Sequence, residues 1–272
     1  MVQILLLVLL IASFALHFLA GPVPLDMFAF PLNVILLLIW GITLVWSWRK
    51  HRKSLFVMYM LSPSATFWAI GMLLVFALVI GLTGMRWLTR TWPFFFIMVY
   101  FMTVLSYVIL RGFRAPTPTG ARLGDIRWRF VFLHVGLLIT VISGFAGAPD
   151  NDEMSLKVHK NMAGYHGIGL ELVDFQLDTY DNGTPSEFRA VMNIDGKEVT
   201  LKVNHPYSRR FAEDVYLTGY DKAAGADSQY CIVQIVRDPW KYGVTAGIIL
   251  IITGAFMLFI GGPRRRHSNE MD

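Results

Sequence analysis

The feature that most constrains the fold is a set of six long apolar segments that contain no Asp, Glu, Lys or Arg. Each is close to the roughly 20 residues that a helix rising about 1.5 Å per residue needs to cross about 30 Å of hydrocarbon. A helix of a soluble protein rarely lacks charge over that length. The sequence therefore predicts a six-helix transmembrane bundle, with spans at Val2–Ala20, Phe28–Trp48, Ser64–Leu82, Pro93–Leu110, Phe130–Ala148 and Tyr242–Ile260.

The composition agrees with a membrane protein. Charged residues are 16% of the chain and hydrophobic residues 55%, whereas soluble domains average about 25% charged residues. The net charge of +5 would suggest a nucleic-acid partner in a soluble chain, but here the basic residues flank the apolar segments. We therefore expect a lipid bilayer and no nucleic acid. The single cysteine, Cys231, excludes an intramolecular disulfide, a CxxC redox pair and a zinc site made of cysteines.

The basic residues of the short loops predict the orientation. With alternating spans, the loops that fall on one side carry most of the arginine and lysine, and the loops opposite hold only Arg86 and Arg90. We therefore expect a protein of the cytoplasmic (inner) membrane with both termini in the cytoplasm and residues 149–239 outside. The clusters on the cytoplasmic side are Arg49, Lys50, Arg52 and Lys53; Arg111, Arg114, Arg122, Arg127 and Arg129; and Arg264, Arg265 and Arg266.

The first apolar segment has a second interpretation, as a cleaved signal peptide. Its start, Met1 to Gln3, lacks a positive region, and its apolar run exceeds the usual length of about 7–15 residues. We therefore favour a retained helix. Its removal would leave the orientation of the other spans unchanged.

The hydrophilic segment 149–239 shows the pattern of strands. Asp195-Gly196 separates two alternating runs and predicts a tight hairpin, and Asp181-Asn182-Gly183 predicts another turn. We expect a small extracytoplasmic antiparallel β domain of about six strands, a sandwich or a curled sheet, inserted between helices 5 and 6. The strands expected are Leu170–Tyr180, Glu187–Ile194, Glu198–Asn204, Asp214–Tyr220 and Tyr230–Val236.

Two histidines, His17 and His134, are the only ionisable residues inside the expected spans apart from tyrosines. His17 lies near the outer end of the first span, where a tolerated interfacial histidine is the simpler interpretation. His134 lies about one turn inside the cytoplasmic end of the fifth span. A histidine at that depth must pair with a polar group or coordinate a ligand, because an unsatisfied polar group in hydrocarbon is costly. A hydrogen bond to a neighbouring helix is the alternative to a ligand.

Neutral imidazole is a common axial ligand of haem iron. Gly136 and Gly144 permit close helix approach on the same span, and Arg127 and Arg129 lie just cytoplasmic of His134, where they could contact haem propionates. The positive-inside rule explains these two arginines equally well. No second ligand is evident in the same leaflet, so a partner would have to supply it.

The remaining candidates favour structural roles. His159, His166 and His205 lack a spacing typical of metal ligands. Cys231 lies in an apolar strand, which is typical of a small buried residue rather than a nucleophile. We find no Ser-His-Asp arrangement, P-loop or GxGxxG motif, and therefore name no catalytic residue.

Several short motifs occur together in the second half of the chain. In order they are Phe132-Leu-His134-Val-Gly136, Asp181-Asn-Gly183-Thr184-Pro185, Val203-Asn204-His205-Pro206, Tyr216-Leu-Thr-Gly219-Tyr220 and Val236-Arg237-Asp238-Pro239. Their order resembles the ResB/CcsB family, the System II cytochrome c biogenesis proteins. The resemblance covers roughly Ser62 to Gly262. Trp240 stands where the family has a glycine, and Thr218 where it has a glutamine.

The resemblance implies four regions. Residues 1–61 would be two extra N-terminal helices and a basic cytoplasmic loop, and residues 62–148 three helices of the ResB-like core. Residues 149–239 would be the extracytoplasmic β-rich domain, which is short for the family, and residues 240–272 the last helix and a basic tail.

The resemblance also implies a function. Members act with a ResC/CcsA-type membrane protein that carries a tryptophan-rich haem-handling segment, which we do not find here. The pair brings haem outward and attaches it to apocytochrome c. His134 would then be the haem ligand supplied by this subunit, with haem b bound transiently and His134 touching metal only through the haem iron. We expect a non-autonomous subunit of a haem-lyase complex rather than a complete enzyme.

Two other functions stay open. The chain could be a membrane scaffold without haem whose β domain docks a redox partner or apocytochrome, in which case His134 is replaceable. It could also be a b-type electron-transfer subunit, with His17 and His134 as ligands, although they are expected near opposite faces of the membrane. Ion transport is least favoured, because the spans hold no charge.

Overall fold

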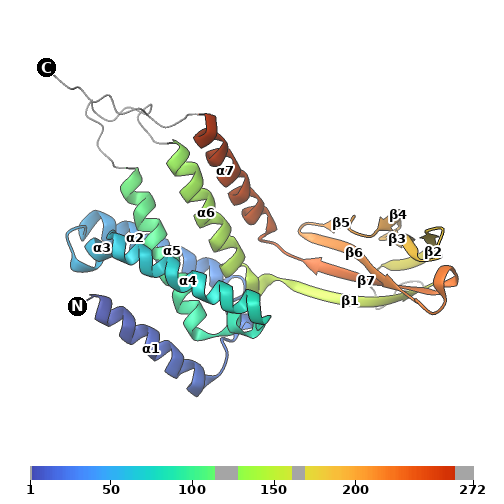
Figure 1. The fold of residues 1–272 in the computed structure, drawn as a ribbon, viewed down its shortest axis with the longest axis horizontal. Coiled ribbons are helices and arrows are strands. Elements are labelled where there is room, and N and C mark those ends of the chain that lie inside the picture. The colour runs from blue at the N-terminus through green and yellow to red at the C-terminus, as the bar shows by residue number, and fades with distance from the viewer. Residues whose placement is uncertain (1, 114–127, 161–168, 261–272) are drawn as a thin grey trace. The chain divides into compact units, whose positions relative to one another are not determined.

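The computed structural model describes residues 2–113, 128–160 and 169–260. The chain forms two compact units (Figure 1). The helical unit comprises residues Met1–Pro149 and Tyr242–Asp272, and the β unit comprises Asp150–Lys241. Along the chain, the strands of the β unit lie between the helices α6 and α7.

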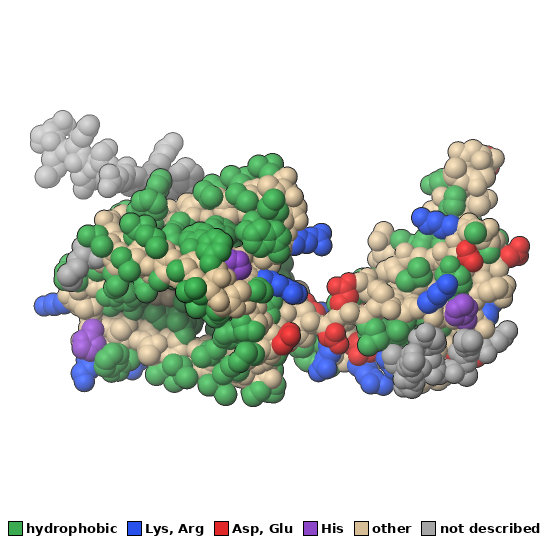
Figure 2. Space-filling model, turned by 90° about the horizontal axis from the view of Figure 1, so that it is seen from below, with side chains coloured by type: hydrophobic (Ala, Val, Ile, Leu, Met, Phe, Trp, Pro, Cys, Tyr) green, Lys and Arg blue, Asp and Glu red, His purple; other side chains and the backbone are tan. Residues whose placement is uncertain are grey.

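Within the described residues, six helices are long and apolar enough to cross a membrane, which confirms a multi-pass membrane protein. Hydrophobic side chains cover much of the face of this unit seen in Figure 2. The short helix α3 was not predicted. The helices are α1 (Val2–Ala20), α2 (Leu32–Lys50), α3 (Leu55–Met60), α4 (Pro63–Thr83), α5 (Trp92–Gly112), α6 (Trp128–Ala146) and α7 (Lys241–Ile260).

The helix ends follow from local chemistry. The Ser62 hydroxyl accepts a hydrogen bond from the Ala65 amide, and Pro63 occupies the first turn of α4, where its missing N–H leaves no bond unmade. Gly84 ends that helix in the left-handed conformation. Helix α2 begins at Leu32 rather than at the predicted Phe28, because Leu25–Phe28 forms a separate 3-10 turn before Pro31.

Helix α5 is the centre of the helical unit and the most buried of the long helices. It packs against α1, α2, α4 and α6. Two tyrosine hydroxyl groups on α5 are satisfied across these contacts: Tyr100 donates to the Ala65 carbonyl oxygen at 3.1 Å, and Tyr107 shares a 2.6 Å hydrogen bond with Ser47. Such bonds are needed because hydrocarbon offers no alternative partner.

Helices α6 and α7 meet through small residues. An added Cβ on Gly136 would lie 2.7 Å from the Gly247 carbonyl oxygen, and one on Gly247 would meet the Thr140 hydroxyl. Further along, a Cβ on Gly254 would lie 2.9 Å from Leu133. The backbones therefore approach more closely than larger side chains would allow, as in other membrane helix pairs. We call this contact the α6–α7 seam.

The β unit contains two antiparallel sheets, with strand orders β1-β7-β6-β5 and β2-β3-β4. An antiparallel β domain is therefore confirmed. Strands β1 and β5 were not predicted, because the first four residues of β1 are exposed and β5 has only four residues. The strands are β1 (Asp152–His159), β2 (Leu170–Thr179), β3 (Pro185–Ile194), β4 (Lys197–Lys202), β5 (Tyr207–Arg210), β6 (Glu213–Tyr220) and β7 (Tyr230–Arg237).

The two sheets share one apolar core. Alternate residues of each strand point inward, and side chains such as Met192, Leu201, Val215 and Val233 are fully buried there. Asp195 and Gly196 form the predicted β3–β4 turn, with φ values of 50° and 84°. Left-handed values at both central residues suit a two-residue hairpin.

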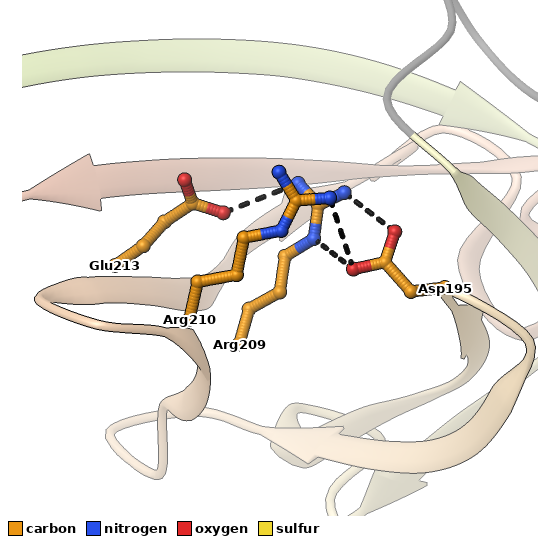
Figure 3. Close-up of polar contacts among 4 residues, drawn as sticks. All are labelled: Asp195, Arg209, Arg210 and Glu213. Carbon is orange, nitrogen blue, oxygen red and sulfur yellow. Dashed lines mark hydrogen bonds and ion pairs between the residues drawn. The ribbon is translucent and has the colours of Figure 1, made fainter.

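An arginine links the two sheets (Figure 3). Arg209 of β5 donates two 2.7 Å hydrogen bonds to the carboxylate of Asp195 in the β3–β4 turn, and a 3.2 Å bond to Glu213 of β6. Its side chain is only 6% exposed. Arg210 approaches Asp195 at 3.6 Å from the solvent side. The bidentate pair therefore ties the hairpin of one sheet to an edge strand of the other.

Candidate functional site

His134 lies in the second turn of α6 and is half-buried. Its Nδ1 lies 2.9 Å from the carbonyl oxygen of Phe130, one turn earlier in the same helix. A carbonyl oxygen only accepts, so Nδ1 carries the proton and donates. The lone pair of the neutral ring is therefore on Nε2, to which no other described residue donates a hydrogen bond. This is the form in which imidazole ligates a metal, with the second nitrogen fixed by a hydrogen bond.

The ring of Phe130 packs against one face of the His134 imidazole. The two rings stack with centroids 4.0 Å apart and planes 28° from parallel. Phe130 in turn lies directly on Gly112, the last residue of α5, where any added Cβ would overlap its ring. The absence of a side chain at Gly112 thus lets Phe130 pack against α5. Phe130 in turn limits where the imidazole of His134 can lie.

His134 does not lie on the face of α6 that forms the α6–α7 seam. Positions on a helix turn by about 100° per residue, so Gly136, Thr140 and Ser143 lie on a different face from His134. These three residues face the glycines of α7. His134 instead shares its face with Leu138 and Val141, which pack against the core around α5.

The structure describes one of the two arginines predicted as propionate contacts. Arg129 is half-buried in the first turn of α6, and five residues separate it from His134. Five residues correspond to about 140° around a helix, so the two side chains leave α6 on different faces. Arg127 lies outside the described residues.

His17 lies on α1, far from His134. Its ring stacks nearly parallel to Trp87, with centroids 6.5 Å apart, in the turn Arg86–Arg90 that leads into α5. His134 is anchored through Phe130 at the other end of α5. A 21-residue helix is about 30 Å long, so the two imidazoles cannot ligate one iron within this chain. The Nδ1 of His17 is buried without a hydrogen-bond partner among the described residues.

The described histidines of the β unit, His159 and His205, do not form a metal site with other described residues. His205 is exposed in a turn after Asn204, whose φ is 61°, and His159 packs its ring 5.3 Å from that of Tyr230. His166 lies outside the described residues. Within the described ranges, no cluster of three His, Cys, Asp or Glu side chains could hold a metal ion.

Cys231 is a small core residue, as predicted. It lies on β7 with no exposed surface. Burial raises the pKa of its thiol to about 12. Almost none of it is therefore thiolate near neutral pH, and the thiolate is the nucleophilic form.

Sequence reasoning missed the Phe130–Gly112 pair. The four-residue spacing of Phe130 and His134 on one helix is a signal that could have revealed the stacked rings. Nothing in the sequence pairs Phe130 with Gly112, because 15 residues separate α5 from α6 and the register of the two helices depends on their packing.

Residues 127–232 match the model of the ResB-like family. This segment is ResB-like. The match begins at the helix that carries His134 and ends within β7. ResB/CcsB is the System II cytochrome c biogenesis family, so the match supports a membrane protein of cytochrome c maturation.

No curated protein matches the chain. Among solved structures, a chain described as "Cytochrome c Heme Lyase CcmF" is similar at a TM-score of 0.38 and 12% sequence identity. The similarity covers 59% of this chain and 29% of that chain. At that score and coverage the likeness carries no argument about activity.

The turns of the ResB-like segment have clear local causes. In the motif Asp181–Pro185, the side chain of Asn182 accepts hydrogen bonds from both the amide and the hydroxyl of Thr184, at 3.0 and 2.6 Å. This closes the β2–β3 turn.

Just beyond the segment, Trp240 has a contact of its own. Its indole N–H donates to Asp150 at 2.6 Å, so the two ends of the β unit are joined. A glycine at this position could not make that bond.

Proposed function

We propose that this protein is a haem-handling membrane subunit of a System II cytochrome c maturation complex. The ResB-like match supports the pathway. The observation that carries the haem-handling role is the Nδ1–Phe130 hydrogen bond, because it leaves the Nε2 lone pair of His134 free inside an apolar span. Haem is the cargo in this proposal, and His134 binds its iron transiently.

The donor chemistry fits haem, and His134 would supply one of its two axial ligands. Among the described residues, His134 does not line the cavities at Tyr59–Tyr100, Trp40–Phe145 or Trp46–Tyr107, so we infer that a second protein closes the porphyrin site. A ResC/CcsA-type partner would supply the second axial ligand and the machinery for thioether formation. Of the two arginines, Arg127 is the main proposed propionate contact from this chain. Arg129 leaves α6 about 140° around the helix from His134 and would reach a propionate only through the length of its side chain.

The proposed orientation places the end of α6 that carries His134 toward the cytoplasm, the side from which haem would be brought outward. The β unit would then lie outside and receive apocytochrome c. Arg49, Lys50, Arg52 and Lys53 at the end of α2 support this orientation. The other basic clusters extend into 114–127 and 261–272, outside the described residues.

Haem content tests the proposal. The full chain would be purified with its ResC/CcsA-type partner, as wild type and as His134→Ala, and haem counted by the pyridine haemochrome spectrum per mole of protein. We expect haem with the wild type and a severalfold loss in the variant. Imidazole added during purification should restore haem to His134→Ala, because it fills the space left by the ring and supplies the missing nitrogen.

His205→Ala is the matched control, because that histidine is exposed on the β unit and should leave the haem content unchanged. Unchanged haem in His134→Ala would overturn the ligand role and leave the scaffold function. Equal losses in His134→Ala and His17→Ala would favour a b-type subunit with two haem sites. One haem shared by both histidines is already excluded by their positions at opposite ends of α5.

A further inference from the structure

We propose a second binding site, for an anionic phospholipid, where α2, α3 and α5 come together at the end of the helical unit. The proposal stands apart from haem binding and uses none of the same residues. It rests on three features: a run of cations without an ion pair to any described carboxylate, a cavity beside it, and a short helix with an exposed apolar face.

The cations lie in the last turn of α2 and the residues that follow it, Arg49 to Lys53, which we call the basic loop. Arg49, Lys50, Arg52 and Lys53 are exposed, and none pairs with a carboxylate of the described residues. No Asp or Glu occurs anywhere between residues 27 and 124. Arg111, at the end of α5, reaches the same place and donates to the Leu61 carbonyl oxygen just after α3. The positive charge at this end therefore has no partner within that stretch of the chain.

A cavity of about 300 Å³ lies next to the basic loop, between α2, α3 and α5. Trp46 of α2 and Phe56 of α3 lie on either side of the basic loop in the sequence. Both line the cavity, together with Thr43, Ser47 and Tyr107. Trp46 is 54% exposed and Phe56 42% exposed, so the aromatic rings are accessible. The Ser47 and Tyr107 hydroxyls hydrogen-bond to each other, and the Thr43 hydroxyl donates to a carbonyl oxygen of its own helix. These hydroxyl groups therefore need no hydrogen bond from a ligand. Such a lining suits an acyl chain.

Helix α3 has the character of a helix that lies in the membrane interface. Val57 and Met60 are buried against the bundle, while Leu55 and Met58 point outward. An apolar face beside a row of cations is the pattern that binds anionic lipid surfaces. Arg52 also lies over the ring of Trp48 at 4.7 Å, which holds one cation close to the bundle.

The positive-inside rule explains cations at this end of α2, but it does not require a cavity beside them. A free phosphate would use the cations and leave the cavity unused. A phospholipid with an anionic headgroup uses both, with its phosphate on the basic loop and an acyl chain along Trp46 and Phe56. We therefore assign the site to that class of lipid.

The test uses the full chain, stripped of lipid in a neutral detergent. Phosphatidylglycerol and phosphatidylcholine with the same acyl chains would be titrated and bound lipid counted by native mass spectrometry. We expect the anionic lipid to bind at least tenfold more tightly. In Arg49→Gln/Arg52→Gln/Lys53→Gln, each lost charge should weaken that binding about fivefold. Arg86→Gln/Arg90→Gln, at the other end of the bundle, should bind like the wild type.

A second variant tests the cavity. Thr43→Phe adds bulk to its wall without removing a bond between helices, and should weaken long-chain phosphatidylglycerol more than a short-chain form. Equal affinity for both headgroups, an equal loss in the Arg86→Gln/Arg90→Gln control, or full competition by inorganic phosphate would each overturn the lipid assignment. Haem content of the triple variant should be unchanged, so neither proposal depends on the outcome of the other.

Discussion

A histidine inside an apolar helix has two nitrogens to satisfy, and α6 itself satisfies only one of those of His134. The Phe130 carbonyl oxygen receives the Nδ1 proton, although that oxygen already belongs to the helix hydrogen-bond pattern. The other nitrogen is left as an acceptor in a region of low polarity. This differs from the buried hydroxyls of Tyr100 and Tyr107, which find partners on neighbouring helices. His134 thus differs from these tyrosines in having a side-chain polar atom without a partner among the described residues, a feature it shares with His17, Trp92 and Ser106.

At the same scale, Asp195 predicts how the β unit responds to acid. The hydrogen bonds from Arg209 are the largest cause that holds the pKa of Asp195 below its ordinary value of 3.8. A carboxylate with a lowered native pKa contributes stability above its unfolded pKa, and this is lost as the pH falls through the native pKa. The free energy of unfolding of the β unit should therefore fall progressively below about pH 4–5.

Asp195→Asn should make that fall shallower, because the variant has no proton to take up at this site. The measurement is urea unfolding of the full chain in detergent at several pH values, followed by the protease resistance of the β unit. Asp181→Asn, at an exposed turn without an ion pair to any described residue, is the control and should retain the wild-type slope. Identical slopes for wild type and Asp195→Asn would contradict the role given to the Arg209 pair.

At the scale of elements, the packing of α5 against α6 should determine the position of the His134 ring. Gly112→Ala places a methyl group where the Phe130 ring lies, so Phe130 must move, and His134 stacks on that ring. We expect haem content in the complex with the partner to fall severalfold while the chain stays folded. Gly41→Ala, in α2, is the control because an added Cβ there meets nothing within 4 Å. An unchanged haem spectrum in Gly112→Ala would show that Phe130 does not position the imidazole.

The α6–α7 seam makes a separate prediction about stability. Gly247→Leu would force a side chain into Thr140 and the Gly136 carbonyl oxygen, and overpacking of this kind costs about 1–3 kcal/mol or more. Thermal unfolding in detergent should show a lower midpoint than the wild type. Gly71→Leu on α4, which projects into open space, should have little effect. Equal midpoints for the two variants would mean that the seam does not stabilise the bundle.

The elements also show what sequence patterns can and cannot reveal. All six long helices were predictable because lipid demands uncharged stretches about 20 residues long. Helix α3 was missed because a six-residue helix leaves too short a pattern, and its form depends on burial of Val57 and Met60. The start of α2 was wrong by four residues, since composition alone does not separate a 3-10 turn from a helix. The Arg209–Asp195 pair joins two sheets whose packing no local pattern encodes.

At the scale of the whole molecule, the proposed orientation predicts which exposed positions a membrane-impermeant reagent reaches from outside. Cys231 is the chain's single cysteine and has no exposed surface, so single-cysteine variants of the full chain should label cleanly. Ser186→Cys on the exposed turn side of β3 should react with a membrane-impermeant maleimide in intact cells. His51→Cys in the basic loop should react only after the membrane is opened. The reverse pattern would invert the proposed orientation and place the His134 end of α6 outside.

The two candidate sites differ in how much of each could be recognised from the sequence. His134 was recognisable from sequence because an ionisable residue in an apolar span is rare and a short motif surrounds it. Its tautomer and the support from Gly112 required the structure. The lipid site was not predictable, since it combines a charged loop with a cavity built from three helices.

The seam has a consequence for how the protein is made. Helix α6 leaves the ribosome well before α7, because the whole of residues 147–240 must be synthesised between them. Throughout that interval the small-residue face of α6 has no α7 to cover it. The last helix therefore completes the bundle only when the β unit has been made. A chain truncated within the β unit would display an open groove of Gly136, Thr140 and Ser143, a signal that membrane quality control could use to remove unfinished molecules.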